Sequence, residues 1–575
     1  MKIYTIIAQI GIAAFLMTGC SKEFLNKVPQ GELSDSQIGS AESIEMQLLG
    51  AYSIMNGNVS GTWGNYASAP SQWIFGEMTS DNAHKGSDQT DQPNMNMIES
   101  YSVNSENDNL STMWQVYYEG VQRANKTLVL LAADQAGVKE VTAERVIQIQ
   151  AESRMLRAHY YFFMWRIFKN LPWIDENTTF EDAKVKPNTE DILPKIIEDL
   201  KFAASNLPNT KINNEYGRMD QNAAKAYLGK VYLYEKKYAE ALPLFKEVIG
   251  GKDITSMNFW NNFNILTENG SEAIMVAKHA INSNGNGENA NVGDMLGGLY
   301  GTSPVGCCGF YQPTIDLANA FKVTANGLPM LDNSYRTNAY KSDMGLVDTK
   351  TDSAKTKYKV DTTLRFDPRL DYTVGRRGVM YLDYGVMPGD DWIRDAKYGG
   401  PFVGMKTMIP KALFATQSAS GENYITGLDV NIIRLADVVL MAAECEVELG
   451  NLSGALILVN SVRNRAAKLE AKKTIEGKNA ARYSVKPYPV FTSQDNARQA
   501  VRFERRLELA MEGHRFFDLV RWGIAKDVIT TYSAFEGVLL PSYKNLNFTS
   551  KSEIYPIPLG EIDKSNGTLT QNTGY

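Results

Sequence analysis

The sequence predicts a mainly α-helical fold, in which paired helices form a scaffold that packs against an irregular, loop-rich half. Long segments with apolar residues at three- and four-residue spacing predict the helices, and one segment matches a helix-pair repeat. Two other long segments lack this periodicity. With 575 residues the chain can bury a sizeable core, and we expect one body over residues 41–575.

Helical spacing dominates the first part of this body. The segments that show it cover residues 41–56, 108–133, 142–168 and 191–207. Asp108 and Thr142 stand at the start of two of these segments. Both are predicted N-caps, because their side-chain oxygens can accept hydrogen bonds from backbone N–H groups of the first turn.

A tetratricopeptide-like pattern occurs at residues 222–249. Gly229 and Ala241 are the small residues that let two antiparallel helices approach closely, and Phe245 fills the space beside them. A weaker version of the pattern follows at residues 435–467. Pairs of this kind build short solenoids by stacking on one another. The helical scaffold is therefore expected over residues 41–56, 108–250 and 430–530.

The irregular segments span residues 57–107 and 250–430 and are rich in Gly, Asn, Asp and Ser. Irregular segments of this length usually carry function, and we expect the two to meet on one face of the scaffold. Aromatic residues in them suit sugar binding, because a ring can stack on the C–H face of a sugar. The other interpretation is that these rings are buried and pin the loops to the helices. They include Trp63, Tyr66, Trp73, Tyr300, Phe310, Tyr311, Tyr381, Tyr384 and Trp392.

The N-terminus has the features of a lipoprotein signal peptide. Lys2 precedes an apolar run that ends in small residues before Cys20. We therefore expect removal of residues 1–19, lipid on Cys20 and a tether over residues 20–40. A retained membrane helix is the alternative, since the run is close to the span threshold of about 18 residues. Polar residues within the run and the absence of a basic stop sequence favour cleavage.

Composition narrows the chemistry. The formal net charge is −6 with both signs interspersed, which argues against a nucleic-acid partner. There are only 4 His, and the sequence contains no serine-nucleophile elbow, zinc-binding helix motif or phosphate-binding glycine loop. Glu504, Glu508 and Glu512 share a helix face with several arginines, which predicts a salt-bridge lattice rather than a glycosidase pair. We expect no catalysis, no metal site and no cofactor.

Four cysteines are too few for a disulfide scaffold. Cys445 lies in an apolar helical pattern and is predicted to be a buried thiol. The adjacent Cys307 and Cys308 could form a vicinal disulfide in an oxidising compartment, or remain two free thiols.

Several motifs of the C-terminal third occur together and in a fixed order. They are residues 434–444 (RLADVVLMAAE), 459–466 (VNSVRNRA), 503–523 (FERRLELAMEGHRFFDLVRWG) and 554–558 (IYPIP). With these runs, the chain resembles the SusD/RagB family of Bacteroidetes surface lipoproteins. Two earlier segments, 154–162 (RMLRAHYYF) and 366–370 (FDPRL), and the lipoprotein start fit the same resemblance, which covers essentially the whole mature chain.

The resemblance implies a SusD-like fold and a role in nutrient capture outside the cell. It implies an outer-membrane, outward-facing lipoprotein that binds oligosaccharide or polysaccharide and delivers it to a SusC-like TonB-dependent transporter. The scaffold helices would face the transporter. A peptide ligand, which some relatives bind, stays open, as do a surface glycoside hydrolase and a purely structural partner of the transporter.

The resemblance also points to regions for ligand contact. In the family, sugar contacts come from the early loops and from the segments around a Gln-Pro-Thr-type helix start, which is Gln312-Pro313-Thr314 in this sequence. The ligand-binding residues expected from these regions are Trp73, Asp81, Tyr300, Phe310, Tyr311 and Trp392.

Overall fold

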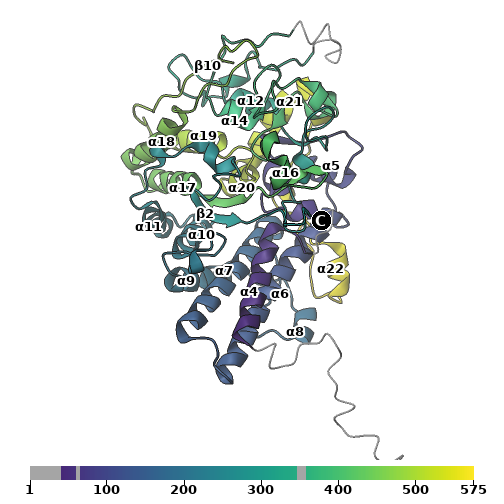
Figure 1. Cartoon of the computed structure of the whole chain (residues 1–575), viewed down its shortest axis with the longest axis vertical. Coiled ribbons are helices and arrows are strands. Elements are labelled where there is room, and N and C mark those ends of the chain that lie inside the picture. The colour runs from purple at the N-terminus through teal and green to yellow at the C-terminus, as the bar shows by residue number, and fades with distance from the viewer. Residues whose placement is uncertain (1–39, 60–64, 346–357) are drawn as a thin grey trace, which may run out of the picture.

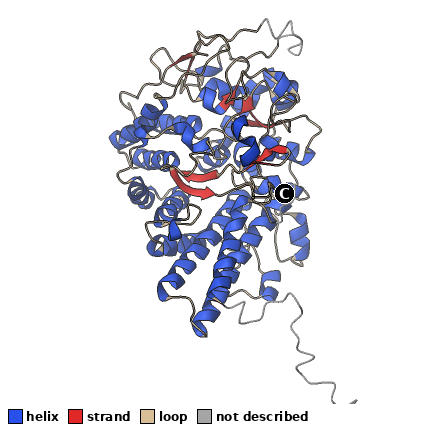
Figure 2. Ribbon diagram, viewed as in Figure 1, coloured by secondary structure: helices blue, strands red, loops and turns tan. Residues whose placement is uncertain are grey.

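The longest helices lie in the lower part of Figure 1, while shorter helices, loops and small strand pairs make up the upper part (Figure 2). The structure, a computed structural model, describes residues 40–59, 65–345 and 358–575. The predicted signal peptide, Cys20, nearly all of the tether and Trp63 lie outside these residues. The predicted mainly α fold is confirmed. Within the described part of the chain, no helix is both long enough and apolar enough for a membrane span.

The secondary structure consists of many helices and five two-stranded sheets among the described residues. The longer helices are α4 (Ala41–Ser53), α6 (Asp108–Ala136), α7 (Ala143–Phe168), α9 (Leu193–Asn206), α10 (Gln221–Tyr234), α11 (Tyr238–Ile249), α17 (Leu435–Glu448), α18 (Leu452–Ala466), α19 (Gln494–Glu508) and α21 (Ala525–Leu539). The shorter ones are α5 (Pro93–Glu99), α8 (Phe180–Lys184), α12 (Ile315–Ala320), α14 (Leu370–Thr373), α15 (Ala396–Gly399), α16 (Phe414–Gln417), α20 (Arg515–Arg521) and α22 (Leu559–Lys564). The strand pairs are β1 (Ala83–Gly86) with β3 (Phe310–Pro313), β2 (Ala273–Ala277) with β9 (Val430–Arg434), β4 (Arg365–Phe366) with β10 (Arg482–Tyr483), β5 (Val374–Gly375) with β6 (Val403–Gly404), and β7 (Ser418–Ala419) with β8 (Glu422–Thr426).

The scaffold is a continuous array of helices. Helix α6 packs on α4 and α7, and the series continues from α7 through α9, α10, α11 and α17 to α18 and α19. The predicted close approach of α10 and α11 is present, because a Cβ at Gly229 would lie 2.6 Å from the Phe245 ring. Thr142 caps α7 as predicted, whereas α6 is capped by Asn107, one residue before the expected Asp108.

The two irregular segments meet, as the sequence predicted. Strands β1 and β3 pair antiparallel, with His84 opposite Gln312 and Gly86 opposite Phe310. Thr314 then caps α12 by accepting a hydrogen bond from Leu317 N, and its hydroxyl donates to the Asp81 carbonyl at 2.8 Å. Backbone pairing therefore fixes the early loops against the segment that precedes α12.

Buried charges join the scaffold to the loop-rich half. Glu508 on α19 lies 2.9 Å from Arg369, which follows β4, and 2.7 Å from Arg434 at the end of β9. It also pairs with Arg465 of α18. Glu504, one turn earlier on α19, lies 2.8 Å from Arg369. All of these side chains are at most 1% exposed, so the predicted salt-bridge lattice is confirmed. The shared helix face is wrong for Glu512, because α19 ends at Glu508; Glu512 lies beyond the helix and pairs with Arg434 and Lys406.

Burial alone would raise the pKa of Glu508, because a charge is poorly solvated inside a protein. The positive charges of Arg465, Arg434 and Arg369 outweigh burial and hold the pKa well below its ordinary value of 4.5. A carboxyl group with a lowered native pKa stabilises the fold above its unfolded pKa. That stability is lost as the pH falls below about 4.5 toward the native pKa.

We expect Glu508→Gln to lower the free energy of unfolding by about 3–5 kcal/mol at pH 7, because it leaves buried arginines without their anion. The variant should also lose less stability than the unmodified chain between pH 5 and pH 3. Urea unfolding at several pH values measures both effects. Glu181→Gln, at a side chain 78% exposed, is the control and should change stability by less than about 0.5 kcal/mol. An unchanged pH profile in Glu508→Gln would contradict the assignment.

Candidate functional site

Trp73 and Tyr311, two of the expected ligand-binding residues, lie in the core. They are 1% and 3% exposed, and their ring centroids are 5.3 Å apart. The indole N–H of Trp73 donates to the Gly293 carbonyl at 3.1 Å. These contacts join the two irregular segments. In this structure the two rings are therefore buried and pin the loops, which is the second of the two interpretations of the aromatic residues. Ligand contact by either ring remains a prediction, and it would require the surrounding loops to move.

Asp81 is also buried and its carboxylate is already paired. Arg515 binds both carboxylate oxygens, at 2.7 and 3.0 Å, and Arg506 lies 3.1 Å away. Burial opposes ionisation of Asp81, but the two guanidinium groups hold its pKa well below the ordinary value. Its present role is therefore to anchor the early loop on the segment that follows α19.

Phe310 and Trp392 are 2% and 5% exposed. The Lys85 ammonium lies 5.6 Å from the centroid of the Phe310 ring. Trp392 packs edge-on against Tyr381, with centroids 5.6 Å apart, in a small core beneath the neighbouring loops. Ligand contact by these two residues likewise stays a prediction.

Tyr300 differs from the other five because it is only half-buried. The guanidinium carbon of Arg394 lies 5.5 Å from its ring centroid. Arg394 pairs in turn with Asp88, at 2.7 Å, and with Asp91, and its side chain is 33% exposed. The ring and the three charged groups thus form one partly open cluster that combines both irregular segments.

The backbone beneath Tyr300 is fixed. Tyr300 N donates to the Trp392 carbonyl and Thr302 N to the Asp391 carbonyl, each at 3.1 Å. Gly301 between them has φ +62°, and any side chain there would collide with the Asp391 carbonyl. A glycine is therefore required where this loop approaches residues 391–392.

The β7–β8 hairpin brings a second tyrosine to the same place. A Cβ on Gly298 would collide with the Cys307 carbonyl and would be 3.0 Å from the Tyr424 Cβ, so both groups lie next to Gly298. Tyr424 is half-buried. Burial raises its pKa, and the carboxylate of Glu422 and the neighbouring Tyr66 contribute to this. The Tyr300 surface, as we define it, consists of Asp88, Asp91, Tyr300, Cys307, Cys308, Arg394 and Tyr424.

The sequence singled out Tyr300 in this set but not Arg394, Tyr424 or the two aspartates. Asp88 accepts hydrogen bonds from the backbone of Thr90 and Asp91, a local turn that the Asp and Thr content of this segment could have indicated. Tyr424 lies in β8, and only the fold brings that strand to Tyr300.

The cysteines take one of the two predicted forms. Cys307 and Cys308 are joined by a disulfide, and both residues are half-buried. Cys445 is a free, buried thiol, as predicted.

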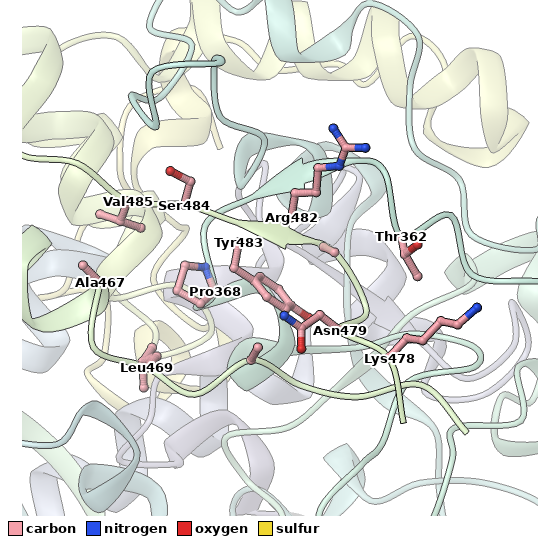
Figure 3. A pocket seen from close by; sticks show the side chains of 12 residues that line it. Thr362, Pro368, Ala467, Leu469, Lys478, Asn479, Arg482, Tyr483, Ser484 and Val485 are labelled. Carbon is pink, nitrogen blue, oxygen red and sulfur yellow. The ribbon is translucent and has the colours of Figure 1, made fainter. Parts of the chain in front are cut away.

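Two grooves lie elsewhere on the protein and share no residue with the Tyr300 surface. The first, about 630 Å³, lies around β10 and has Tyr483 at its centre (Figure 3). The Tyr483 hydroxyl donates to Asp371 at 2.5 Å, so its polar end is bound to the protein. The second, about 840 Å³, is lined by residues of α6, α8 and α22, including Trp114, Tyr118 and Phe180.

The arrangement at the Tyr300 surface suits ligand binding. Two half-buried tyrosine rings offer flat apolar faces, and Arg394 with its aspartates offers donors and acceptors for hydroxyl groups. Among the described residues, no group of three or more His, Cys, Asp or Glu side chains could hold a metal ion.

Sequence comparison identifies the family. The profile of the SusD family matches residues 271–575, which is more than half of the chain. The chain belongs to the SusD family. A second profile, described as starch-binding and associating with the outer membrane, matches residues 23–233.

Relatives span the whole chain at low identity. "SusD-like protein P25" of Formosa agariphila is 25% identical over 604 aligned residues that cover 100% of both chains. A solved "Laminarin binding SusD-like protein" superimposes with a TM-score of 0.65 and 23% identity, over 93% of this chain and 100% of that one. Surface glycan-binding protein A from Bacteroides thetaiotaomicron, in complex with laminarihexaose, gives a TM-score of 0.63 and 19% identity, over 93% and 99%. At these identities the solved structures establish the SusD-like fold.

Arg506 tests whether the Asp81 region is structural. Its guanidinium, 2% exposed, lies 2.7 Å from Asp316 and donates to Asn82 and Tyr335 at 2.9 Å. We expect Arg506→Ala to lower the free energy of unfolding by about 3–5 kcal/mol, because it leaves buried carboxylates unpaired.

The matched control is Arg498→Ala on the same helix. That arginine is 25% exposed, lies 2.7 Å from Glu448, and should contribute less than about 1 kcal/mol. Guanidinium unfolding of both variants measures the difference. Equal losses of stability would contradict the buried-lattice assignment.

Proposed function

We propose that this protein captures oligosaccharides at the cell surface, with the Tyr300 surface as the binding site. The observation that carries the proposal is the position of Tyr300, a half-open aromatic ring beside Arg394 on a rigid loop. Sugar recognition needs an apolar face for the C–H side of the ring and polar groups for its hydroxyls. The Tyr300 surface supplies both from loops that the strand pairing already fixes, so little ordering would accompany binding.

The relatives support a glucan as the first ligand to test. Two of the solved structures are of a laminarin-binding SusD-like protein and of a surface glycan-binding protein in complex with laminarihexaose, and the profile over residues 23–233 is described as starch-binding. The ligand panel therefore contains laminarihexaose and maltohexaose, with a mixture of short peptides as the arm for a peptide-binding protein. Reducing ends released from laminarin or starch would instead indicate a surface hydrolase.

In this proposal the protein is lipid-anchored through Cys20 in the outer membrane and delivers its ligand to a SusC-like TonB-dependent transporter. Helices α4, α6, α7 and α8 gather at the lower end of the molecule (Figure 1). They and their connections expose several large apolar side chains: Met46, Leu49, Val129, Val138, Ile147, Phe180 and Val185. Exposed apolar side chains on one end of a protein favour that end as a partner surface.

We expect Tyr300→Ala to weaken oligosaccharide binding about tenfold or more, because a stacked aromatic ring contributes about 1.4 kcal/mol or more to such a contact. Thermal unfolding should change little, since Tyr300 is half-exposed. Trp73→Ala should lower the free energy of unfolding by about 3–5 kcal/mol, and weaker binding by its folded fraction would show that this ring also contacts the ligand. Isothermal titration and calorimetric unfolding give both numbers.

The control for Tyr300→Ala is Tyr216→Ala, because Tyr216 is 62% exposed and is not part of the Tyr300 surface. Its affinity should equal that of the unmodified chain. If Tyr300→Ala binds as tightly as Tyr216→Ala, the site lies elsewhere. If the unmodified chain binds no member of the panel, the proposed function is wrong.

The partner surface can be tested on α4. Met46 and Leu49 are 57% and 47% exposed and lie three residues apart on one helix face. We expect the double variant Met46→Glu, Leu49→Glu to reduce co-purification of the transporter from native membranes, while its oligosaccharide affinity stays the same. Val538→Glu, at a side chain 80% exposed on α21, is the control and should co-purify normally. Normal co-purification of the double variant would remove α4 from the interface.

A further inference from the structure

The Cys307–Cys308 disulfide belongs to the Tyr300 surface. Both cysteines are half-buried, unlike Cys445, which is fully enclosed. A disulfide usually stabilises a protein by closing a long loop of the unfolded chain, and the effect grows with loop length. Adjacent cysteines enclose no such loop. Its contribution must therefore be local.

Hydrogen bonds already fix the backbone of the loop that contains the two cysteines. Cys308 N and Gly309 N both donate to the Gly298 carbonyl, at 2.9 and 2.8 Å. Ser303 donates to the Leu299 carbonyl at 2.7 Å and accepts from Gly306 N at 3.0 Å. The backbone is thus secured without the sulfur atoms, and a Cβ built on Gly306 would meet no atom within 4 Å. The loop borders open space at this point.

The backbone around the disulfide lies close to both tyrosines. A Cβ on Gly309, the residue after Cys308, would be 3.2 Å from the Tyr300 Cβ and 3.6 Å from the Arg394 Cβ. A Cβ on Gly298 would collide with the Cys307 carbonyl and lie 3.0 Å from the Tyr424 Cβ, so these two groups are neighbours beside Gly298. The two cysteines thus have Tyr300 and Arg394 near the residue that follows them, and Tyr424 near the Cys307 carbonyl.

Resting on the proposed function, we propose that the Cys307–Cys308 disulfide is itself a ligand-contacting element, an apolar platform for the C–H face of a sugar ring between Tyr300 and Tyr424. Bonded sulfur atoms are polarisable, and dispersion attraction favours their contact with C–H groups. They carry no hydrogen to donate and accept hydrogen bonds weakly. Little free energy is therefore lost when a sugar displaces the water that contacts them. The bond also holds both sulfur atoms at one position, whereas two thiols would rotate separately.

The ligand class that fits is a neutral oligosaccharide whose consecutive rings present apolar faces. Tyr300 and Tyr424 would stack on rings on either side of the one above the disulfide, while Arg394 would donate to hydroxyls at the edge. The platform exists only in the oxidised protein, and a cell-surface location is one in which disulfides persist.

The test compares the full-length protein, purified in detergent, with the double variant Cys307→Ser, Cys308→Ser. The ligand is laminarihexaose or, if this does not bind, the member of the panel that the unmodified chain binds. Isothermal titration should show about tenfold weaker binding by the variant, a loss typical of one lost ring contact. Thermal unfolding should change little, because the hydrogen bonds to Gly298 do not use the side chains.

A second measurement uses the unmodified chain, and it decides the question even if the double serine variant fails to fold. The unmodified chain is titrated before and after treatment with a phosphine reductant, followed by removal of the reductant under argon. Cys445 is a thiol in both states, so a change in affinity between the two titrations reports the Cys307–Cys308 bond. Cys445→Ala should bind normally and should respond to reduction as the unmodified chain does. Reduction is expected to weaken binding to the same extent as the serine substitutions.

The outcomes distinguish the proposed binding site at Tyr300 from ligand contact by the disulfide. If Tyr300→Ala weakens binding but neither the serine variant nor reduction changes affinity by more than about twofold, the disulfide is no ligand contact and the proposed site stands. If neither Tyr300→Ala nor the loss of the disulfide has an effect, the proposed site and this inference both fail. Weakening by Tyr300→Ala, by the serine variant and by reduction supports the inference.

Discussion

A carboxylate that moves from water into a protein interior loses its hydration, and positive groups must replace it. Glu504 and Glu508 meet this requirement through arginines that come from separate parts of the chain, including Arg369 after β4 and Arg434 at the end of β9. Helix α19 is consequently the place where scaffold and loop-rich half are held together. If one of these segments were displaced, the lattice would contain an unpaired buried charge. The position of the loops is therefore tied to the position of the helices.

This constraint explains the character of the motifs that carry the family resemblance. Residues 503–523 contain Glu504, Arg506 and Glu508, all of which contact protein groups. Such a motif specifies the fold with little information about the ligand. The Tyr300 surface, by contrast, is assembled from loops outside these motifs, so its side chains can differ among proteins that share the lattice.

The helices were predictable because their signals are local. The Gly229 and Phe245 contact follows from spacing along two neighbouring helices, and Thr142 caps the turn that it precedes. The N-cap of α6 was misplaced by one residue, because Asn107 and Asp108 have equivalent capping chemistry. Burial of aromatic residues was not predictable in the same way. Trp73 is buried and hydrogen-bonded to Gly293, more than two hundred residues away, whereas Tyr300, also in an irregular segment, is half-open.

Helix α11 ends at Ile249 and its packing partner α17 begins at Leu435, so the whole of residues 250–434 lies between two helices that touch. Closing a loop of this length before contacts form is entropically unfavourable, and non-local pairing slows folding. The helices up to α11 contact one another in chain order and can assemble early. Docking of α17 must wait for the intervening segment to be synthesised. A chain arrested between these two points would expose the apolar face of α11 that packs on α17, so the partly folded protein would be prone to aggregation during this interval.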